Sequence, residues 1–420
     1  MNIQPRLNTS SKPLLESKIV KIRRDIFYLY AARAARGFGD GFAVIVLPAY
    51  LSEIGFTPFQ IGLVAAAALL GSAGMTLAVG ILARHHDLRR LLLISALAMV
   101  LTGVALPNFE IFAFVLVIVF IGTMNPSTGD IGMFVPLEHA MLAHGVPDHD
   151  RTRIFAHYSL IGAIATAVGA LAAATPDGLI LLGLDKTNAL KAMFYLYAGL
   201  GLVSIGFYQS LPRTESHDTT PRATALGPSK GIVYKLAALF SLDAFAGGFA
   251  VQSLVALWLF ERFDLSLAQA SLFFFWSNVL TAFSYPVAVR LAKRFGLVNT
   301  MVFTHIPSSA CLIVAAFSPN LTVVLTLLLI RSALSQMDVP TRTSYVMAVV
   351  TPAERPAAAS VTAVPRSLAS SISPALAGAL LATSFSGLPL VICGVLKIVY
   401  DVSLLITFRH VKPPEEKDRG

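Results

Sequence analysis

The sequence predicts an all-helical integral membrane protein, with twelve transmembrane helices arranged as two related six-helix bundles. Hydrophobic residues make up 55% of the 420 residues and charged residues only 13%. That is too little charge to cover the surface of a soluble protein of this length. The hydrophobic residues also fall into long runs, and short sequence matches relate the first half of the chain to the second.

The long apolar runs give the predicted spans. A transmembrane helix needs roughly 20 predominantly apolar residues, and the first run is too long for the core of a signal peptide, so we expect it to be retained. The predicted spans are residues 26–51, 60–83, 90–106, 111–137, 153–174, 190–210, 233–260, 266–289, 297–317, 321–349, 357–383 and 387–408. They divide the chain into an N-terminal tail (1–25), a first bundle (26–210), a central linker (211–232), a second bundle (233–408) and a C-terminal tail (409–420).

The distribution of basic residues predicts the orientation. With the N-terminus inside, the inner loops, linker and tails hold 23 of the 32 Lys and Arg residues, whereas the outer loops hold only Lys186, Lys191 and Arg262. Basic residues accumulate on the cytoplasmic side of membrane proteins. We therefore expect a multi-pass protein of the inner (cytoplasmic) membrane, with both termini and the linker in the cytoplasm.

Short repeats support two equivalent halves. Gly-Phe-Ala-Val at residues 41–44 recurs at residues 248–251, an offset of 207, and the Ser-x-x-Asp motif at residues 127–130 recurs at residues 335–338, an offset of 208. Six predicted spans separate the copies, so both copies have the same orientation. The pattern predicts a parallel repeat about an axis along the membrane normal.

With these features the chain resembles the major facilitator superfamily over essentially its whole length. The stretch at residues 80–90 is similar to the family signature between spans two and three, but Arg84 occupies the acidic position and Asp87 that of the second glycine. The stretches at residues 125–130 and 335–342 look like a bacterial branch of the family. The resemblance implies gating roles for the residues of both signature copies: Arg84, Asp87, Arg89, Arg90, Lys293 and Arg294.

Charged residues within the predicted spans are functional candidates, because an unpaired charge at membrane depth is costly. Arg33, Arg36 and Asp40 share one face of the first span, since they are spaced at i, i+3 and i+7. The alternative interpretation is that such charges pair and hold the bundles together, and we expect this of Lys397 and Asp401, which stand one turn apart.

The resemblance implies that spans one, four, seven and ten line a central cavity. It therefore favours a role in substrate binding or coupling for polar residues of these spans. For the uncharged Asn125, the alternative is hydrogen bonding between helices. For Asp130 and Asp338, the alternative is a hinge or structural role. The candidate substrate-binding and coupling residues are Arg33, Arg36, Asp40, Asn125, Asp130, Asp243, Arg331 and Asp338.

Asp243 is the preferred proton-coupling residue at this stage. A coupling carboxylate should be buried and only weakly held by a cation. Asp40 has Arg36 one turn away, whereas no basic residue stands within a turn of Asp243. Arg33, Arg36 and Arg331 outnumber Asp40 and Asp243 by one, which favours an anionic or oxygen-rich substrate.

No sequence motif indicates an enzyme. A Walker motif, a nucleophile elbow and an HExxH motif are all missing from the sequence. We therefore expect no catalytic residues, no metal, no cofactor and no nucleic-acid partner. The expected partners are a small-molecule substrate, protons and the lipid bilayer, and we expect a monomer.

Together these features predict a secondary active transporter that works by alternating access, with the proton gradient as its energy source. Proton-coupled efflux of a small anionic or amphiphilic compound, by antiport, is the first expectation. Uptake of an organic anion or another nutrient is the alternative. A non-transporting membrane receptor or scaffold is the alternative from another class.

Overall fold

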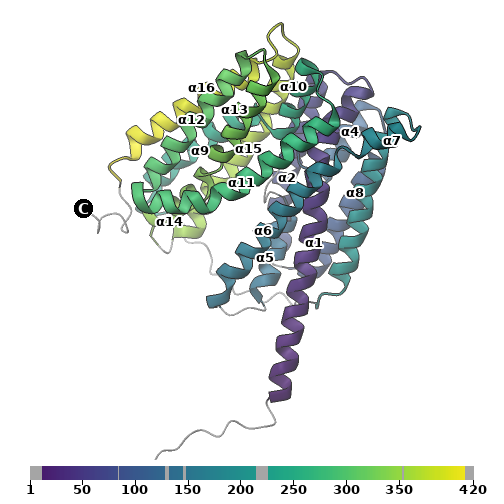
Figure 1. Ribbon diagram of the computed structural model, residues 1–420. Coiled ribbons are helices and arrows are strands. Elements are labelled where there is room, and N and C mark those ends of the chain that lie inside the picture. Colours follow the sequence, from purple (N-terminus) through teal and green to yellow (C-terminus); the bar gives the residue numbers. More distant parts are fainter. Residues whose placement is uncertain are drawn as a thin grey trace, which may run out of the picture.

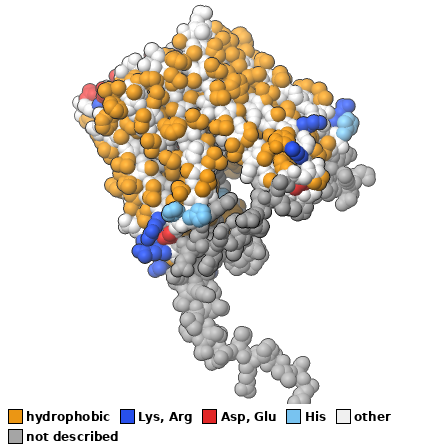
Figure 2. Space-filling model, turned by 180° about the vertical axis from the view of Figure 1, so that it is seen from behind, with side chains coloured by type: hydrophobic (Ala, Val, Ile, Leu, Met, Phe, Trp, Pro, Cys, Tyr) orange, Lys and Arg blue, Asp and Glu red, His pale blue; other side chains and the backbone are white. Residues whose placement is uncertain are grey.

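The structure is a computed structural model that describes residues 12–83, 85–127, 132–144, 148–213, 226–351 and 354–411. Within these ranges the chain forms helices and no strand. Figure 1 shows the two halves side by side, with the first half in purple to teal and the second in green to yellow. Hydrophobic side chains cover most of the face seen in Figure 2, as expected of a surface in contact with lipid.

Each half contains eight helical segments. The first half consists of α1 (Lys12–Glu53), α2 (Pro58–Leu82), α3 (Leu88–Ala105), α4 (Phe112–Ile121), α5 (Phe134–His144), α6 (Asp148–Ala172), α7 (Thr175–Leu181) and α8 (Lys186–Gln209). The second consists of α9 (Lys230–Gly248), α10 (Gln252–Phe263), α11 (Leu267–Phe295), α12 (Leu297–Phe317), α13 (Leu321–Ser335), α14 (Asp338–Val349), α15 (Arg355–Leu381) and α16 (Leu388–Phe408).

The segments make up the twelve predicted spans. Nine helices or helix pairs of the described chain are long and apolar enough to cross a membrane. The other three spans are α1, which carries intramembrane charges, the Ser-rich α15, and the α4–α5 pair, in which α4 has only 10 residues. Helix α9 begins at Lys230, inside the stretch that the sequence assigns to the linker.

Equivalent helices of the two halves begin in the same way. Thr57 and Gln60 form a capping box at the start of α2, and Ser266 and Gln269 form one at the start of α11. In each box the hydroxyl accepts from the backbone N–H three residues on, while the Gln side chain accepts from the N-cap backbone. The offset of 209 residues between the boxes agrees with the internal repeat.

Three spans that the sequence predicts as continuous are interrupted. Helix α4 ends at Ile121 and α5 begins at Phe134; α9 and α10 are separated by residues 249–251, and α13 and α14 by residues 336–337. Pro126 lies in the first interruption and cannot donate to a helix. Its carbonyl accepts from the backbone N–H of Ser253 in α10, at 3.1 Å, so two of the interruptions meet across the halves.

The apolar cores show how the halves are joined. One core cluster contains residues of both halves, among them Leu51, Ile61, Trp258 and Leu381, and lies at the end remote from the chain termini. At the end that carries the termini, each half has its own core, one around Tyr208 and the other around Phe408. The halves therefore share a core at one end only, and their helices diverge toward the termini in Figure 1.

The closest approach between the halves joins α2 and α15. A Cβ atom on Gly62 would collide with the carbonyl of Pro374, and one on Gly378 would collide with the carbonyl of Pro58, so only glycine fits at either position. At the same end the Asp177 carboxylate of α7 accepts from the backbone N–H of Ala268 in α11, at 3.0 Å. These contacts close the molecule on the side remote from the termini.

Candidate functional site

A buried cluster in the first half surrounds Arg36, and we call it the Arg36 cluster. The Arg36 guanidinium of α1 forms an ion pair with Glu138 of α5 and donates to the Tyr208 hydroxyl of α8 at 3.1 Å. Tyr208 donates to one oxygen of Glu138 at 2.6 Å, and Tyr158 of α6 donates to the other. The Phe134 ring lies 4.0 Å from the guanidinium carbon. Both charges of the cluster are thus neutralised.

Arg33 lies one turn from Arg36 and is equally buried. Its guanidinium carbon is 5.2 Å from the centre of the Tyr158 ring. It also lies against the backbone of Gly162 in α6, where a Cβ atom would collide with the guanidinium. Gly162 therefore makes room for an arginine inside the bundle.

Asp40, one turn beyond Arg36, has a different environment. Within the described part of the chain, no hydrogen bond or ion pair reaches its carboxylate, because Arg36 is directed to Glu138. The carboxylate borders a cavity of about 20 Å³, which is room for one water molecule. The cavity is lined by Arg33, Arg36, Asp40, Ser72, Met99, Gly122, Thr123, Asn125, Ser127, Gly132, Met133, Phe134 and Tyr197.

Asn125 connects this cavity to the interrupted fourth span. Its carbonyl oxygen accepts from the backbone N–H of Ser127 at 3.0 Å, while its amide nitrogen is buried and has no hydrogen-bond partner among the described residues. On another wall, Thr123 and Tyr197 are joined by a hydrogen bond of 3.1 Å. The cavity is therefore lined by hydrogen-bond donors and by the Asp40 carboxylate, which has no bonded partner in the described chain.

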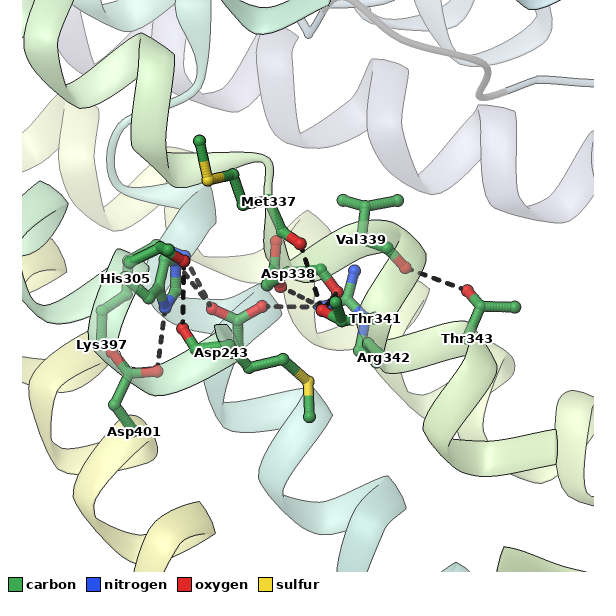
Figure 3. A network of polar contacts seen from close by, with 12 residues as sticks. Asp243, His305, Met337, Asp338, Val339, Thr341, Arg342, Thr343, Lys397 and Asp401 are labelled. Carbon is green, nitrogen blue, oxygen red and sulfur yellow. Dashed lines mark hydrogen bonds and ion pairs between the residues drawn. The ribbon is translucent and has the colours of Figure 1, made fainter. Parts of the chain in front are cut away.

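The second half contains a larger set of buried charges, shown in Figure 3. We call it the Asp243 network, and it consists of Asp243 of α9, His305 of α12, Asp338 and Arg342 of α14, and Lys397 and Asp401 of α16. One carboxylate oxygen of Asp243 accepts from Lys397 at 2.6 Å and the other from Arg342 at 3.1 Å. Arg342 also bonds Asp338 at 2.9 Å.

His305 links the two carboxylates at the other end of the network. Its Nδ1 lies 3.0 Å from Asp401 and its Nε2 3.3 Å from the Lys397 ammonium. The second oxygen of Asp401 is buried and finds no hydrogen-bond partner within the described ranges of the chain. The network is therefore not fully satisfied, in contrast to the Arg36 cluster.

Two expectations about these charges are wrong. Asp243 is not free of cations, because helix packing brings Lys397 and Arg342 onto it from α16 and α14. Lys397 does not pair with Asp401 one turn away; it donates to Asp243, and Asp401 bonds His305 instead. In both cases the expectation considered only neighbours on the same helix.

Two arginine side chains of the second half form no ion pair with an acidic residue of the described chain. In the described residues, no hydrogen bond or ion pair reaches the guanidinium of Arg331 in α13 or that of Arg366 in α15. Arg366 lies within electrostatic range of Arg342 and Asp243. Arg331 is half-buried and faces Cys393 of α16. The second half thus holds unneutralised positive charge.

The predicted gating residues lie at the end that carries the termini. Asp87 caps the start of α3 by accepting from the backbone N–H of Arg89, and Arg89 donates to the carbonyl of Gln209 at 2.5 Å. Lys293 and Arg294 occupy the last turn of α11, and Arg90 lies in the first turn of α3. Nothing in these contacts tests a gating role. Arg84 and the candidate Asp130 lie outside the described residues.

At the same end, Glu354 fixes the start of α9. Its carboxylate accepts from the backbone N–H of Gly227 at 2.5 Å, from the Ser229 hydroxyl at 2.6 Å and from the Thr351 hydroxyl at 2.6 Å. The hydroxyl bonds, first that of Ser229 and then that of Thr351, lower the pKa of Glu354 to about 2. Glu354 therefore joins the loop before α15 to the segment that leads into α9.

Neither His305 nor Glu138 was identified as a site residue from the sequence. The signal for His305 was available, because a titratable residue within an apolar span is a functional candidate by default. Glu138 lies near the edge of its predicted span, and only the packing of α5 against α1 and α6 shows that it is fully buried.

Comparisons with known proteins agree with the fold. The sequence model of the Major Facilitator Superfamily matches residues 29–241 and 236–420. The uncharacterized membrane protein YJR124C of Saccharomyces cerevisiae is 26% identical over 425 residues, covering 92% of this chain and 95% of that protein.

Solved structures give the same result. The crystal structure of the nucleoside transporter NupG superposes with a TM-score of 0.73 at 13% identity, covering 92% of this chain and 99% of that one. That of a D-xylose–proton symporter superposes with a TM-score of 0.72 at 16% identity, covering 93% and 98%. At these identities the likeness establishes the shared fold.

Proposed function

Because this chain belongs to the major facilitator superfamily, a family of secondary transporters that work by alternating access, we propose that it is a proton-coupled transporter of a small organic anion. The fold supplies two halves around a central axis, and the buried charges supply the groups for coupling and binding. The D-xylose–proton symporter shares this fold, which is consistent with a proton gradient as the energy source.

The observation that carries the proposal is the environment of Asp40. The carboxylate borders a polar cavity, and no cation in the described chain is bonded to it. A carboxylate in this position takes up a proton without first breaking an ion pair. Asp243 is held by Lys397 and Arg342. The criterion that favoured Asp243 from the sequence now favours Asp40.

The anionic substrate class follows from the charges of the second half. The charged residues in the interior of its spans are Arg331, Arg342, Arg366 and Lys397 on the basic side and Asp243, Asp338 and Asp401 on the acidic side. Together these side chains leave one positive charge over, and in the described residues no acid is bonded to Arg331 or Arg366. A carboxylate or phosphate group on the substrate would neutralise this charge.

The conformation supports alternating access. The halves share an apolar core only at the end remote from the termini. In the orientation that the basic residues predict, the end at which the two halves diverge faces the cytoplasm. For transport, the contacts of Gly62 with α15, of Asp177 with α11 and of Pro126 with α10 have to separate.

Efflux was expected because Asp243 was thought to be without a cation, and that reason no longer holds. The direction of transport therefore has to be measured as solute flux. Purified protein in liposomes is given a panel of radiolabelled mono- and dicarboxylates and organic phosphates, with the proton gradient imposed in either sense. We expect flux that depends on the gradient, with its sign giving symport or antiport.

Asp40→Asn should abolish the response to the gradient, whereas Asp264→Asn, at an exposed loop position, should leave it unchanged. Flux that ignores the gradient, or an Asp40→Asn variant that still follows it, rules out Asp40 as the coupling residue. No flux of any solute in the panel would favour the receptor or scaffold interpretation.

A further inference from the structure

His305 lies between a carboxylate and an ammonium group, toward one end of a chain of polar contacts (Figure 3). Its Nδ1 is 3.0 Å from Asp401 Oδ1 and its Nε2 is 3.3 Å from Lys397 Nζ. The same Nε2 is 4.0 Å from Asp243 Oδ1, the oxygen that also accepts from Lys397 at 2.6 Å. Lys397 and the His305 ring thus compete for one oxygen.

The contacts define the protonation state of the ring. An ammonium group can only donate, so the lone pair of His305 Nε2 accepts from Lys397. The proton of a neutral ring is then on Nδ1, where it is donated to Asp401. A neutral ring with its proton on Nδ1 fits these contacts, and Nε2 is then the ring atom that can take up a further proton.

A proton on Nε2 makes the contact with Lys397 repulsive. Two donors, each on a cation, would then face one another at 3.3 Å, in a site with little water to screen them. Asp243 is the acceptor within reach of Nε2, and Arg342 keeps its own bond to the other oxygen of Asp243. The imidazolium can therefore replace Lys397 on Asp243.

Lys397 is the residue of the Asp243 network whose side chain can move away from Asp243. Its side chain is 12% exposed, compared with 2% for His305 and none for Asp401. Its long flexible stem lies beside Gly247 of α9, where a Cβ atom would come within 3.9 Å of the ammonium nitrogen. The absence of a side chain at Gly247 leaves space next to Lys397.

We propose that a proton on His305 releases Lys397 from Asp243, so that the ammonium group binds the carboxylate or phosphate of the substrate. This inference rests on the proposed transport of an anion and adds, beside Asp40, a second protonation site that links the proton to the anion. One proton and one negative charge enter together, so the net charge of the occupied site is unchanged. Proton and anion then favour each other's binding, which is the requirement for symport.

The other charged and titratable groups around His305 are compatible with this exchange. They are Asp243 on α9; Lys397, Tyr400 and Asp401 on α16; Asp338 and Arg342 on α14; Arg331 on α13; Cys311 on α12 itself; and Arg290, Lys293 and Arg294 near the end of α11, the helix that precedes α12. Tyr400 contacts the ring edge-on at 6.1 Å, and within the described part of the chain its hydroxyl has no hydrogen-bond partner.

The test measures binding in detergent without a gradient, so its outcome does not depend on coupled flux. Thermal stabilisation of the full-length protein is titrated with succinate, benzoate and inorganic phosphate at about pH 5.5 and about pH 8, which span the range where histidine titrates. For at least one of these anions we expect apparent affinity about tenfold higher at the lower pH. His305→Gln should remove the pH dependence, and Lys397→Met should remove the stabilisation at both pH values.

Lys235→Met, which removes an exposed lysine of α9 outside the network, is the matched control and should behave as wild type. A second readout needs no ligand. Removing Lys397 favours the imidazolium, so Lys397→Met should become more stable as the pH falls, and the added His305→Gln should cancel that gain. No anion effect at the lower pH, pH-dependent binding in His305→Gln, or no pH-dependent gain in Lys397→Met would each overturn the proposal.

Discussion

The Arg36 cluster and the Asp243 network occupy equivalent places in the two halves, but the central residues of the two, Arg36 and Asp243, have opposite charges. The offset of 207 residues that relates α1 to α9 places Arg36 at the position of Asp243. The offset of 208 that relates α5 to α14 places Phe134 at the position of Arg342. In the first half a cation lies over an aromatic ring, and in the second an acid bonds a cation.

The two regions also differ in how completely they are satisfied. In the first half, both oxygens of Glu138 accept hydrogen bonds, from Arg36 and from tyrosine hydroxyls, which stay protonated at physiological pH. In the second, Asp243 is shared by two cations, and in the part of the chain that the structure describes one oxygen of Asp401 has no partner. The first arrangement fixes a bundle. The second offers Asp243 more than one donor, which the proposed release of Lys397 requires.

The largest expected effect comes from opening the Arg36 cluster. Glu138→Gln leaves the guanidinium of Arg36 buried without a counter-charge, and we expect the free energy of unfolding to fall by about 3–5 kcal/mol. Denaturant titration in detergent micelles measures this loss. Asp338→Asn is the comparison in the other half, because Arg342 keeps its bond to Asp243, and we expect a loss of about 1.5–3 kcal/mol. Equal losses would remove the distinction between a fixed and an adaptable region.

The next effect separates stability from transport. Removing both charges of a buried pair is far less costly than removing one. We therefore expect Glu138→Gln with Arg36→Met, and Asp243→Asn with Lys397→Met, each to recover most of the stability lost in the single acid variant. The first double variant should keep most of its flux, whereas the second should lose it. Flux lost in both would show that the Arg36 cluster also takes part in transport.

A smaller effect compares two buried tyrosines. Tyr208 donates to Glu138, so Tyr208→Phe should cost about 1.5–3 kcal/mol, the usual value of a hydrogen bond to a charged group. The Tyr400 hydroxyl has no partner in the network, so Tyr400→Phe should leave the free energy of unfolding nearly unchanged. A loss in Tyr400→Phe as large as that in Tyr208→Phe would mean that the second network is more tightly bonded than the structure shows.

The smallest effect concerns Glu354, outside the spans. Its pKa is lowered from 4.5 to about 2 by the hydroxyl groups of Ser229 and Thr351. A lowered pKa in the folded state contributes stability above the unfolded value, and that contribution is lost as the pH falls from about 4.5 to about 2. Glu354→Gln should therefore lower the melting temperature near neutral pH, and the difference from wild type should shrink in acid. A difference independent of pH would argue against these bonds.

Much of the fold follows from local patterns in the sequence. Apolar runs of spanning length predict the twelve spans, and the offsets of 207 and 208 residues predict the two halves, because both signals are carried by short stretches of chain. The interruptions of spans four, seven and ten were not predicted as breaks. Their apolar runs are continuous, and the backbone leaves the helix at places where the two halves meet, as at Pro126 and Ser253.

The sequence by itself identified many of the charges that lie within the spans, since a charge within an apolar run is visible without a structure. Arg36, Asp40, Asp243 and Asp338 were all identified in this way. Only the tertiary structure decided their partners. Asp243 and Lys397 are 154 residues apart, and Arg36 and Glu138 are 102 apart. Pairing at these separations depends on which helix faces pack together, and it is the reason that we propose Asp40, rather than Asp243, as the coupling residue.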